Sequence, residues 1–130
     1  MRLWHQELLS FLPRAQILGQ HRECCALRGM GWGRKHSTVD YVFTYSVKRL
    51  VDFHLLVLNE MERRGYKPDQ QWYCPEYRGK NTKPWPCTLP EHYHSAKAQL
   101  IYPEHDNAYR EECLANLRKK GVELFVVLPS

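Results

Sequence analysis

Long apolar runs are missing from this 130-residue chain, and no stretch approaches the roughly 20 residues that a membrane span needs. Residues 1–14 mix charged and apolar side chains, without the apolar region or the small-residue cleavage site of a secretory signal peptide. Internal repeats and low-complexity tracts are also missing. We therefore expect a cytoplasmic protein that folds as a single domain over residues 1–130.

Cysteine is present, but not in the patterns that mark a disulfide framework or a zinc site. The five cysteines are odd in number and irregularly spaced, which favours free thiols. No paired CxxC and no HExxH occurs, so the sequence predicts neither a metal site nor a cofactor. A Cys/His metal protein remains a third interpretation, with candidate ligands Cys74, Cys87, His92, His94, His105 and Cys113.

Acidic residues are the other scarce group. The chain has 19 lysines and arginines against 14 aspartates and glutamates, and its net charge is +5 with the histidines neutral. A positive balance favours an anionic partner, which could be nucleic acid, a phosphorylated ligand or a membrane surface. Hydrophobic content of 43% and charged content of 25% are ordinary for a globular protein and argue against wholesale disorder.

The sequence predicts three principal helices, over residues 14–28, 46–66 and 105–121. Pro13 suits a first-turn position, and Gly29 suits the C-terminal cap of the first helix. Ser46 can cap the start of the second helix, and Gly65 can end it. The residues expected to face the core are Ile17, Leu18, Cys24 and Cys25 in the first helix and Leu50, Phe53, Val57 and Met61 in the second.

Between these helices the sequence predicts loops. Residues 34–45 are interpreted as a basic loop followed by a short extended or irregular stretch. Residues 67–90 hold five of the eight prolines and two tryptophans, which predicts a long irregular segment pinned by aromatic side chains. A helical turn or two is expected in residues 92–102, and an extended piece in 122–130. The fold class is therefore mainly α, a single compact domain of about three principal helices with long irregular loops.

Titratable side chains are densest in residues 19–36, GQHRECCALRGMGWGRKH, where Glu23 is the single acid. Cys24 and Cys25 lie inside the predicted helix, where core packing is favoured over a reactive thiolate. The GMGWG cluster lacks the Lys-Ser/Thr of a P-loop and is interpreted as a helix cap and tight turn. The cations and histidines of the segment are His21, Arg22, Arg28, Arg34, Lys35 and His36.

Basic clusters and tryptophans together favour nucleic-acid binding, because cations hold phosphates and aromatic rings stack on unpaired bases. The alternative is that these cations solvate the surface and complement helix dipoles. Outside residues 19–36 the clusters are Arg63 and Arg64, then Arg118, Lys119 and Lys120, and the tryptophans of the whole chain are Trp4, Trp32, Trp72 and Trp85.

Several of these motifs resemble one family. The LGQHRE that ends at Glu23, the RKH at residues 34–36 and the MERRGY at residues 61–66 resemble the phage-type pyrimidine-dimer DNA glycosylases. The opening MRLWH, GWGRKHSTV and YVFTY are similar to a bacterial branch grouped with that family. The resemblance implies a small, monomeric, all-α enzyme that needs no cofactor and repairs double-stranded DNA in the bacterial cytoplasm, associated with the nucleoid. No membrane partner is implied.

The resemblance also implies a mechanism. In the family the N-terminal amine attacks the sugar C1′ of the damaged nucleotide, a Schiff base forms, and β-elimination nicks the strand at the abasic site. A helix glutamate assists, which is Glu23 in this sequence. An α-amine has a pKa of about 7.7–8.0, so part of it is neutral and nucleophilic at cellular pH. A flipped nucleotide would give the amine access to the sugar.

The sequence departs from the family pattern at its start. The family exposes a threonine by removing the initiator Met, whereas the large Arg2 blocks that removal, so the expected nucleophile is the amine of Met1. Ala26 stands where the family has an arginine three residues beyond the glutamate. His21 either orients Glu23 or fills the core. The residues expected to hold DNA are Arg2, His21, Arg22, Arg28, Arg34, Lys35 and His36.

A second interpretation is a non-catalytic nucleic-acid-binding domain on the same fold. In that domain the retained Met1 has lost the chemistry. A separate alternative for Glu23 is an ion pair with Arg2, Arg22 or Arg28 that only orders the N-terminus.

Overall fold

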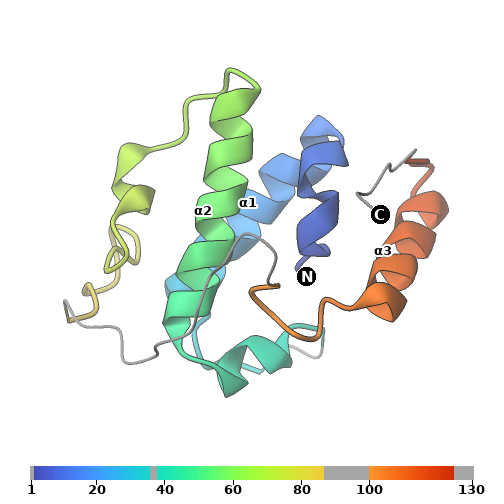
Figure 1. Cartoon of the computed structure of the whole chain (residues 1–130). Coiled ribbons are helices and arrows are strands. Elements are labelled where there is room, and N and C mark those ends of the chain that lie inside the picture. The colour runs from blue at the N-terminus through green and yellow to red at the C-terminus, as the bar shows by residue number, and fades with distance from the viewer. Residues whose placement is uncertain (1, 36–37, 87–99, 125–130) are drawn as a thin grey trace.

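The computed structural model describes residues 2–35, 38–86 and 100–124, which form a mainly helical structure without a β-strand. Figure 1 shows α1 and α2 side by side, with the N-terminal segment between that pair and α3. The three α-helices are α1 (Arg14–Arg28), α2 (Val47–Arg63) and α3 (Asn107–Lys119), and the connections contain the 3-10 helices η1 (Gln6–Phe11), η2 (Asp40–Thr44) and η3 (Gln70–Tyr73).

α1 confirms the helix predicted over residues 14–28. It starts directly after Pro13, and Gly29 occupies its C-terminal cap, where the Gly29 N–H donates to the Cys25 carbonyl at 3.0 Å. Ile17 and Cys24 are fully buried on the expected stripe. Leu18 and Cys25 lie at the edge of that stripe and are only half-buried.

α2 is the most amphipathic helix and confirms the second prediction. The Ser46 hydroxyl accepts a hydrogen bond from the Lys48 N–H at 3.3 Å and so caps the first turn. Gly65 follows the helix with φ of +86°, a conformation that glycine adopts without steric cost. All the residues predicted to face the core are buried, namely Leu50, Phe53, Val57 and Met61.

α3 confirms the third predicted helix with slightly shorter bounds. The Asp106 carboxylate accepts a hydrogen bond from the Tyr109 N–H at 2.8 Å and caps the start of the helix. Cys113 and Leu117, one turn apart, are fully buried and hold the helix against the core.

The expectation of an extended or irregular stretch before residue 45 is wrong for its central part. Residues 40–44 form the 3-10 helix η2. Val39 and Val42 are both fully buried, and a three-residue period places both side chains on one face of a 3-10 helix. Packing of this pair into the core therefore selects the tight helix over an extended strand.

The segment after α2 is irregular as predicted, over the part that the structure covers. The Trp72 ring packs edge-on against Tyr77, with centroids 4.8 Å apart, and Trp85 packs against Trp32 at 6.0 Å. These contacts confirm an irregular segment held by aromatic rings over residues 67–86. Residues 87–90, most of the turn expected in 92–102, and most of the extended piece expected in 122–130 lie outside the described residues.

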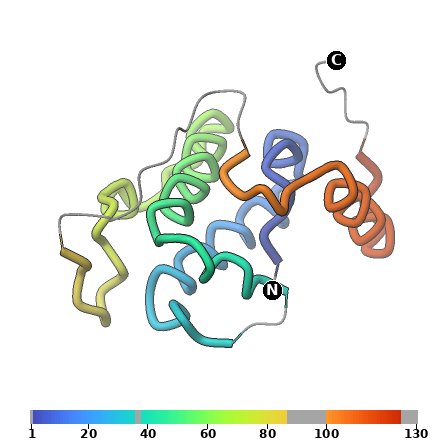
Figure 2. The backbone as a smooth tube through the Cα atoms, turned by 60° about the horizontal axis from the view of Figure 1, so that its bottom comes forward, coloured from blue at the N-terminus to red at the C-terminus, as the bar shows by residue number. Residues whose placement is uncertain are grey.

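The N-terminal segment is part of the core rather than an appendage. Leu3, Leu8 and Leu12 are almost completely buried. In Figure 2 the N-terminal segment that carries them runs between the α1–α2 pair and α3. This burial brings Arg2 beside α1.

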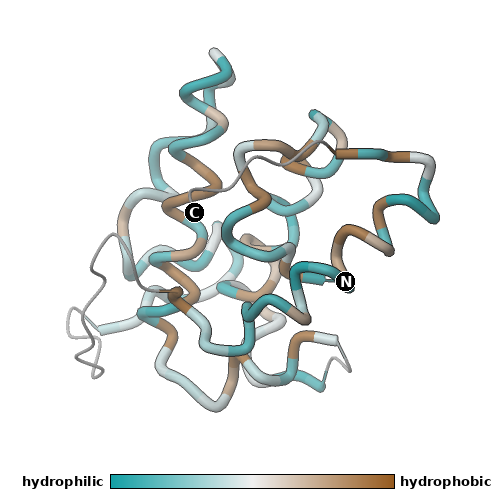
Figure 3. The backbone as a smooth tube through the Cα atoms, turned by 45° about the vertical axis from the view of Figure 1, so that its right-hand side comes forward, coloured by the Kyte–Doolittle hydropathy of each residue, from teal (hydrophilic) through white to brown (hydrophobic). Residues whose placement is uncertain are grey.

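Hydrophilic and hydrophobic residues alternate along the helices (Figure 3). None of the helices in the described ranges is long and apolar enough to cross a membrane.

Candidate functional site

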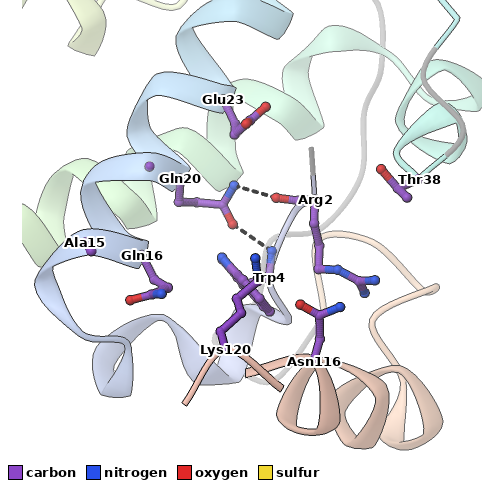
Figure 4. Close-up of a pocket in the computed structure, with 10 residues that line it drawn as sticks. Arg2, Trp4, Ala15, Gln16, Gln20, Glu23, Thr38, Asn116 and Lys120 are labelled. Atoms are coloured by element: carbon purple, nitrogen blue, oxygen red, sulfur yellow. Dashed lines mark hydrogen bonds between the residues drawn. The ribbon is translucent and has the colours of Figure 1, made fainter. Parts of the chain in front are cut away.

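A pocket of about 390 Å³ lies where the N-terminal segment passes between α1 and the end of α3. α1 contributes Glu23 and Gln20, and the end of α3 contributes Asn116 and Lys120 (Figure 4). Arg2 also lines the pocket from the N-terminal segment. The pocket therefore combines one carboxylate with cationic and amide side chains from segments that are far apart in the sequence.

Glu23 is half-buried, and its Oε2 atom is buried with no hydrogen-bond partner among the described residues. A buried carboxylate oxygen without a hydrogen-bond partner is costly, and most buried polar atoms in proteins have one. Glu23 shares its side of α1 with Gly19 and Gln20, because residues three and four apart lie one above the other on a helix. The Glu23 carboxylate therefore has unused hydrogen-bonding capacity at the wall of the pocket.

Arg22 lies on the exposed side of α1 beside the pocket. A Cβ atom at Gly19 would be 3.7 Å from the Arg22 Nη2 atom, so the guanidinium folds back over the pocket wall at Gly19. Arg22 is thus a surface cation next to Gly19 at the edge of the pocket, whereas Glu23 lines the pocket itself.

The main chain that leads into the pocket is held by Gln20 (Figure 4). The Trp4 N–H donates to Gln20 Oε1 at 2.6 Å, and Gln20 Nε2 donates to the Arg2 carbonyl at 3.1 Å. The Arg2 guanidinium lies over the rings of Trp4 and Tyr109, at 5.9 and 5.8 Å from their centroids. Met1, the expected nucleophile, lies outside the described residues.

The structure places the other predicted DNA contacts in different surroundings. Arg34 and Lys35 are exposed in the turn that follows α1, where their charges face solvent. His36 lies outside the described residues. Arg2 forms a long ion pair with Glu112, with 3.9 Å between Nη2 and Oε1. The exposed carboxylate of Glu112 competes with a phosphate for this guanidinium only weakly.

The prediction that Arg28 holds DNA phosphates is wrong. Its side chain is fully buried, and its guanidinium donates to the carbonyls of Trp72, Cys74 and Tyr77 at 2.8, 2.7 and 2.9 Å. Position 28 follows Cys24 by one helical turn and therefore continues the buried stripe of α1. Arg28 fastens the segment after α2 to α1 instead of reaching solvent.

His21 faces away from Glu23 and toward α2, so its position supports neither the predicted DNA contact nor an orienting role toward Glu23. Two positions apart on a helix place side chains on nearly opposite faces. His21 Nδ1 lies 2.9 Å from His54 Nε2 of α2, and its ring packs edge-on against Trp72. Of the two roles left open by the sequence, the structure supports the one in the core.

His21, Cys25 and His54 form the group of described side chains whose arrangement could hold a metal ion, with ligand atoms within 4.8 Å of one another. However, Arg28 Nη1 lies 3.0 Å from His54 Nδ1 and can only donate, so the neutral His54 carries its proton on Nε2. The Nε2 atom of His54 is the one that faces His21 and Cys25, and a protonated nitrogen cannot bind a metal. A metal-bound histidine usually binds with one nitrogen and donates the N–H of the other to a neighbouring acceptor, which Arg28 is not. The group therefore fits a hydrogen-bonded core cluster better than a metal centre.

The pKa directions in this cluster agree with that interpretation. Burial and the Arg28 charge hold the pKa of His54 well below its usual range, and burial raises the pKa of the Cys25 thiol to about 12. Both groups are therefore neutral near pH 7, and Cys25 is not a thiolate nucleophile. Of the other candidate ligands, Cys87, His92 and His94 lie outside the described residues, and Cys74, His105 and Cys113 belong to no such group within them.

Sequence reasoning missed several residues of the pocket. Gln20 carries no charge and sits in an ordinary helical position, and Thr38 and Asn116 gave no signal at all. Lys120 was expected only to complement the dipole of the last helix. Only the packing of α3 beside the N-terminal segment brings Asn116 and Lys120 to Glu23.

A helical domain with a recessed carboxylate, bordered by exposed cations, is suited to a protein that processes nucleic acid. A family model described as pyrimidine dimer DNA glycosylase matches residues 1–74. No curated protein and no solved structure matches the chain. Because the match covers more than half of the sequence, the chain belongs to the pyrimidine dimer DNA glycosylase family and is, at the level of that family, a DNA repair glycosylase.

Proposed function

We propose that this protein is a DNA glycosylase with abasic-site lyase activity on pyrimidine-dimer-type damage. It acts as a monomer on double-stranded DNA in the bacterial cytoplasm, through a Schiff base on the amine of Met1. The observation that carries the proposal is the unpaired, buried Oε2 of Glu23, which lines a pocket beside Arg2 within the segment that matches the family.

The proposed reaction needs a nucleophile and a proton-transfer group. The neutral amine bonds to C1′ while the bond from C1′ to the damaged base breaks, and the base leaves with a proton. Opening of the sugar gives the imine, which acidifies the C2′ hydrogen. Loss of that proton breaks the C3′–O bond and nicks the strand. Glu23 accepts the proton of the attacking amine or donates one to a departing group, because its side chain lines the pocket and its Oε2 has no hydrogen-bond partner among the described residues.

The DNA backbone is held by cations around the pocket. Arg2 and Arg22 lie beside Glu23, and Arg34 and Lys35 extend the cationic surface beyond α1, with His36 as a further proposed contact. Phosphate contacts of this kind fix the position of the duplex and make binding sensitive to salt. No metal is proposed, because the imine itself withdraws electrons from C2′.

The test is borohydride trapping on duplexes that carry either an abasic site or a cyclobutane dimer, followed by mass spectrometry of the trapped peptide. The expected result is a covalent adduct on the Met1 amine with both duplexes. Glu23→Gln is the matched variant, because it keeps the size of the side chain. It should trap and nick about 100-fold or more slowly, with a nearly unchanged dissociation constant.

Two outcomes would contradict the proposal. No adduct with either duplex, from protein whose free N-terminus is confirmed, would leave a nucleic-acid-binding domain on the same fold. Nicking of abasic DNA by Glu23→Gln at the wild-type rate would remove Glu23 from the catalytic machinery.

A further inference from the structure

The main chain of residues 2–4 is held from both sides by side chains of two distant helices. On one side, Gln20 of α1 accepts from the Trp4 N–H and donates to the Arg2 carbonyl. On the other, the Tyr109 hydroxyl of α3 donates to the Leu3 carbonyl at 2.5 Å. Three consecutive residues thus each have a main-chain group fixed by a side chain from elsewhere in the fold.

Gln20 is suited to its position by chemistry as well as by location. It is 1% exposed, and its amide offers one acceptor and one donor group, which match the N–H and the carbonyl that face it. A carboxylate in its place would present only acceptors to the Arg2 carbonyl. Gln20 also precedes Glu23 by one turn of α1, so the same helix face fixes the main chain and carries the proposed acid.

Tyr109 is itself held in place by a buried polar network. Its ring stacks on His105 at 5.0 Å, and the Tyr41 hydroxyl lies 2.7 Å from His105 Nε2. His105 Nδ1 accepts from the Gln6 N–H at 3.2 Å, so the neutral ring donates from Nε2 to Tyr41. The donor that reaches Leu3 is therefore preorganised.

A terminal amine needs such support more than a side-chain nucleophile does. Chain termini fray unless hydrogen bonds or packing tie them down, and an amine that moves by about 1 Å can lose on the order of 100-fold in rate. We propose that Gln20 and Tyr109 are positioning residues, which fix the main chain of residues 2–4 and thereby restrict the positions that the amine of the preceding residue can take during attack on the sugar. This inference rests on the proposed function, in which that amine is the nucleophile.

The test uses Tyr109→Phe, which removes one hydroxyl and keeps the ring, and Gln20→Met, which keeps the length of the side chain and removes both hydrogen bonds. Tyr45→Phe is the control, because the Tyr45 hydroxyl also donates a hydrogen bond, to Glu104 at 3.0 Å, but does not contact residues 2–4. Three quantities are measured for each protein. They are the single-turnover trapping rate at saturating abasic duplex, the dissociation constant for that duplex, and the rate at which Met1 is methylated by formaldehyde and borohydride.

Both variants should trap abasic DNA about 10- to 100-fold more slowly than wild type. Their dissociation constants and formaldehyde reaction rates should match wild type, because a small aldehyde needs no positioning. Tyr45→Phe should behave as wild type in all three measurements. This pattern separates the position of the amine from its intrinsic reactivity and from DNA affinity.

The inference is overturned if Tyr109→Phe and Gln20→Met trap at the wild-type rate, while the proposed function then still stands. It is also overturned if the two variants lose as much rate with formaldehyde as they lose in DNA trapping, relative to wild type. The intrinsic reactivity of the amine, rather than its position, would then have changed. If wild-type protein forms no adduct, the proposed function and this inference fail together. Should thermal denaturation show that Gln20→Met is unfolded, Tyr109→Phe decides alone.

Discussion

At the scale of single residues, Arg22 and Arg28 of α1 show how position on a helix decides the role of a charge. Arg22 and Arg28 belong to the same helix and the same basic run of sequence. Arg22 lies on the exposed side beside the pocket, whereas Arg28 is fully buried beneath the Trp72 ring, 5.1 Å from its centroid. The first is free to meet a phosphate, and the second satisfies backbone carbonyls.

Arg28→Lys should lower the free energy of unfolding by about 2–4 kcal/mol, because a lysine cannot reach three carbonyls and His54 at once. Arg22→Ala should change stability by less than about 0.5 kcal/mol but weaken DNA binding and reduce the salt slope by about one. Urea unfolding and DNA titrations at several salt concentrations measure the two effects. A loss of DNA affinity in Arg28→Lys without a loss of stability would contradict the assignment.

At the scale of elements, the GMGWG turn after α1 is shaped by close backbone contacts, in agreement with its interpretation as a helix cap and tight turn. The Gly31 N–H donates to the Ala26 carbonyl at 2.9 Å. Arg78 donates to the carbonyls of Arg28 and Gly29 at 2.8 and 2.9 Å, so it satisfies the C-terminal end of α1. The turn thereby sets the direction in which the chain continues to Arg34 and Lys35.

Gly31→Ala should destabilise the protein by about 1–3 kcal/mol, because its Cβ atom would lie 2.7 Å from the Ala26 carbonyl oxygen, a helix backbone atom that cannot move aside. Gly33→Ala is the matched control in the same turn. Gly33 has φ of +79° and no atom near its missing Cβ, so the cost there should be only about 1 kcal/mol of backbone strain. Thermal unfolding of both variants tests the difference. Equal losses would show that the contact with Ala26 is not what the turn requires.

At the scale of the whole molecule, neutral histidines are buried where the segments of the fold meet. His5 of the N-terminal segment, His54 of α2 and His105 before α3 are almost completely inaccessible. Burial lowers the pKa of each, and that of His105 falls to about 3. Because the unfolded chain binds protons on these groups near pH 6.5, acidification favours unfolding.

The stability contributed by these neutral histidines should be fully present above about pH 6.5 and should decline as the pH falls toward 3. His105, whose pKa falls to about 3, should contribute a slope that approaches about 1.4 kcal/mol per pH unit below pH 6. His105→Gln removes one such group. The free energy of unfolding of this variant should be lower than that of wild type at pH 7.5, but it should fall less steeply than that of wild type between pH 6 and 5. Urea unfolding at these pH values measures both slopes. Parallel curves for the variant and the wild type would contradict a neutral, buried His105.

Much of the fold could be predicted because helix signals are local. Pro13, Ser46 and Gly65 mark helix ends through interactions within a few residues, and the periodicity of α2 identified its buried face. Glu23 also stood out, as the only acid in a basic helical segment. The same local information failed for residues 40–44, where burial of Val39 and Val42 against distant parts of the chain selects the 3-10 helix.

The sequence by itself therefore determined the three helices, the ends of the first two, the family and the candidate acid, since each depends on neighbouring residues or on a continuous motif. Only the tertiary structure decided that Arg28 is a buried anchor while Arg22 is a surface cation, and that Gln20 and Tyr109 hold the N-terminal segment. Those roles depend on which segment packs against each helix face. The hydrogen-bond partners that define them come from residues tens of positions away, which no local pattern specifies.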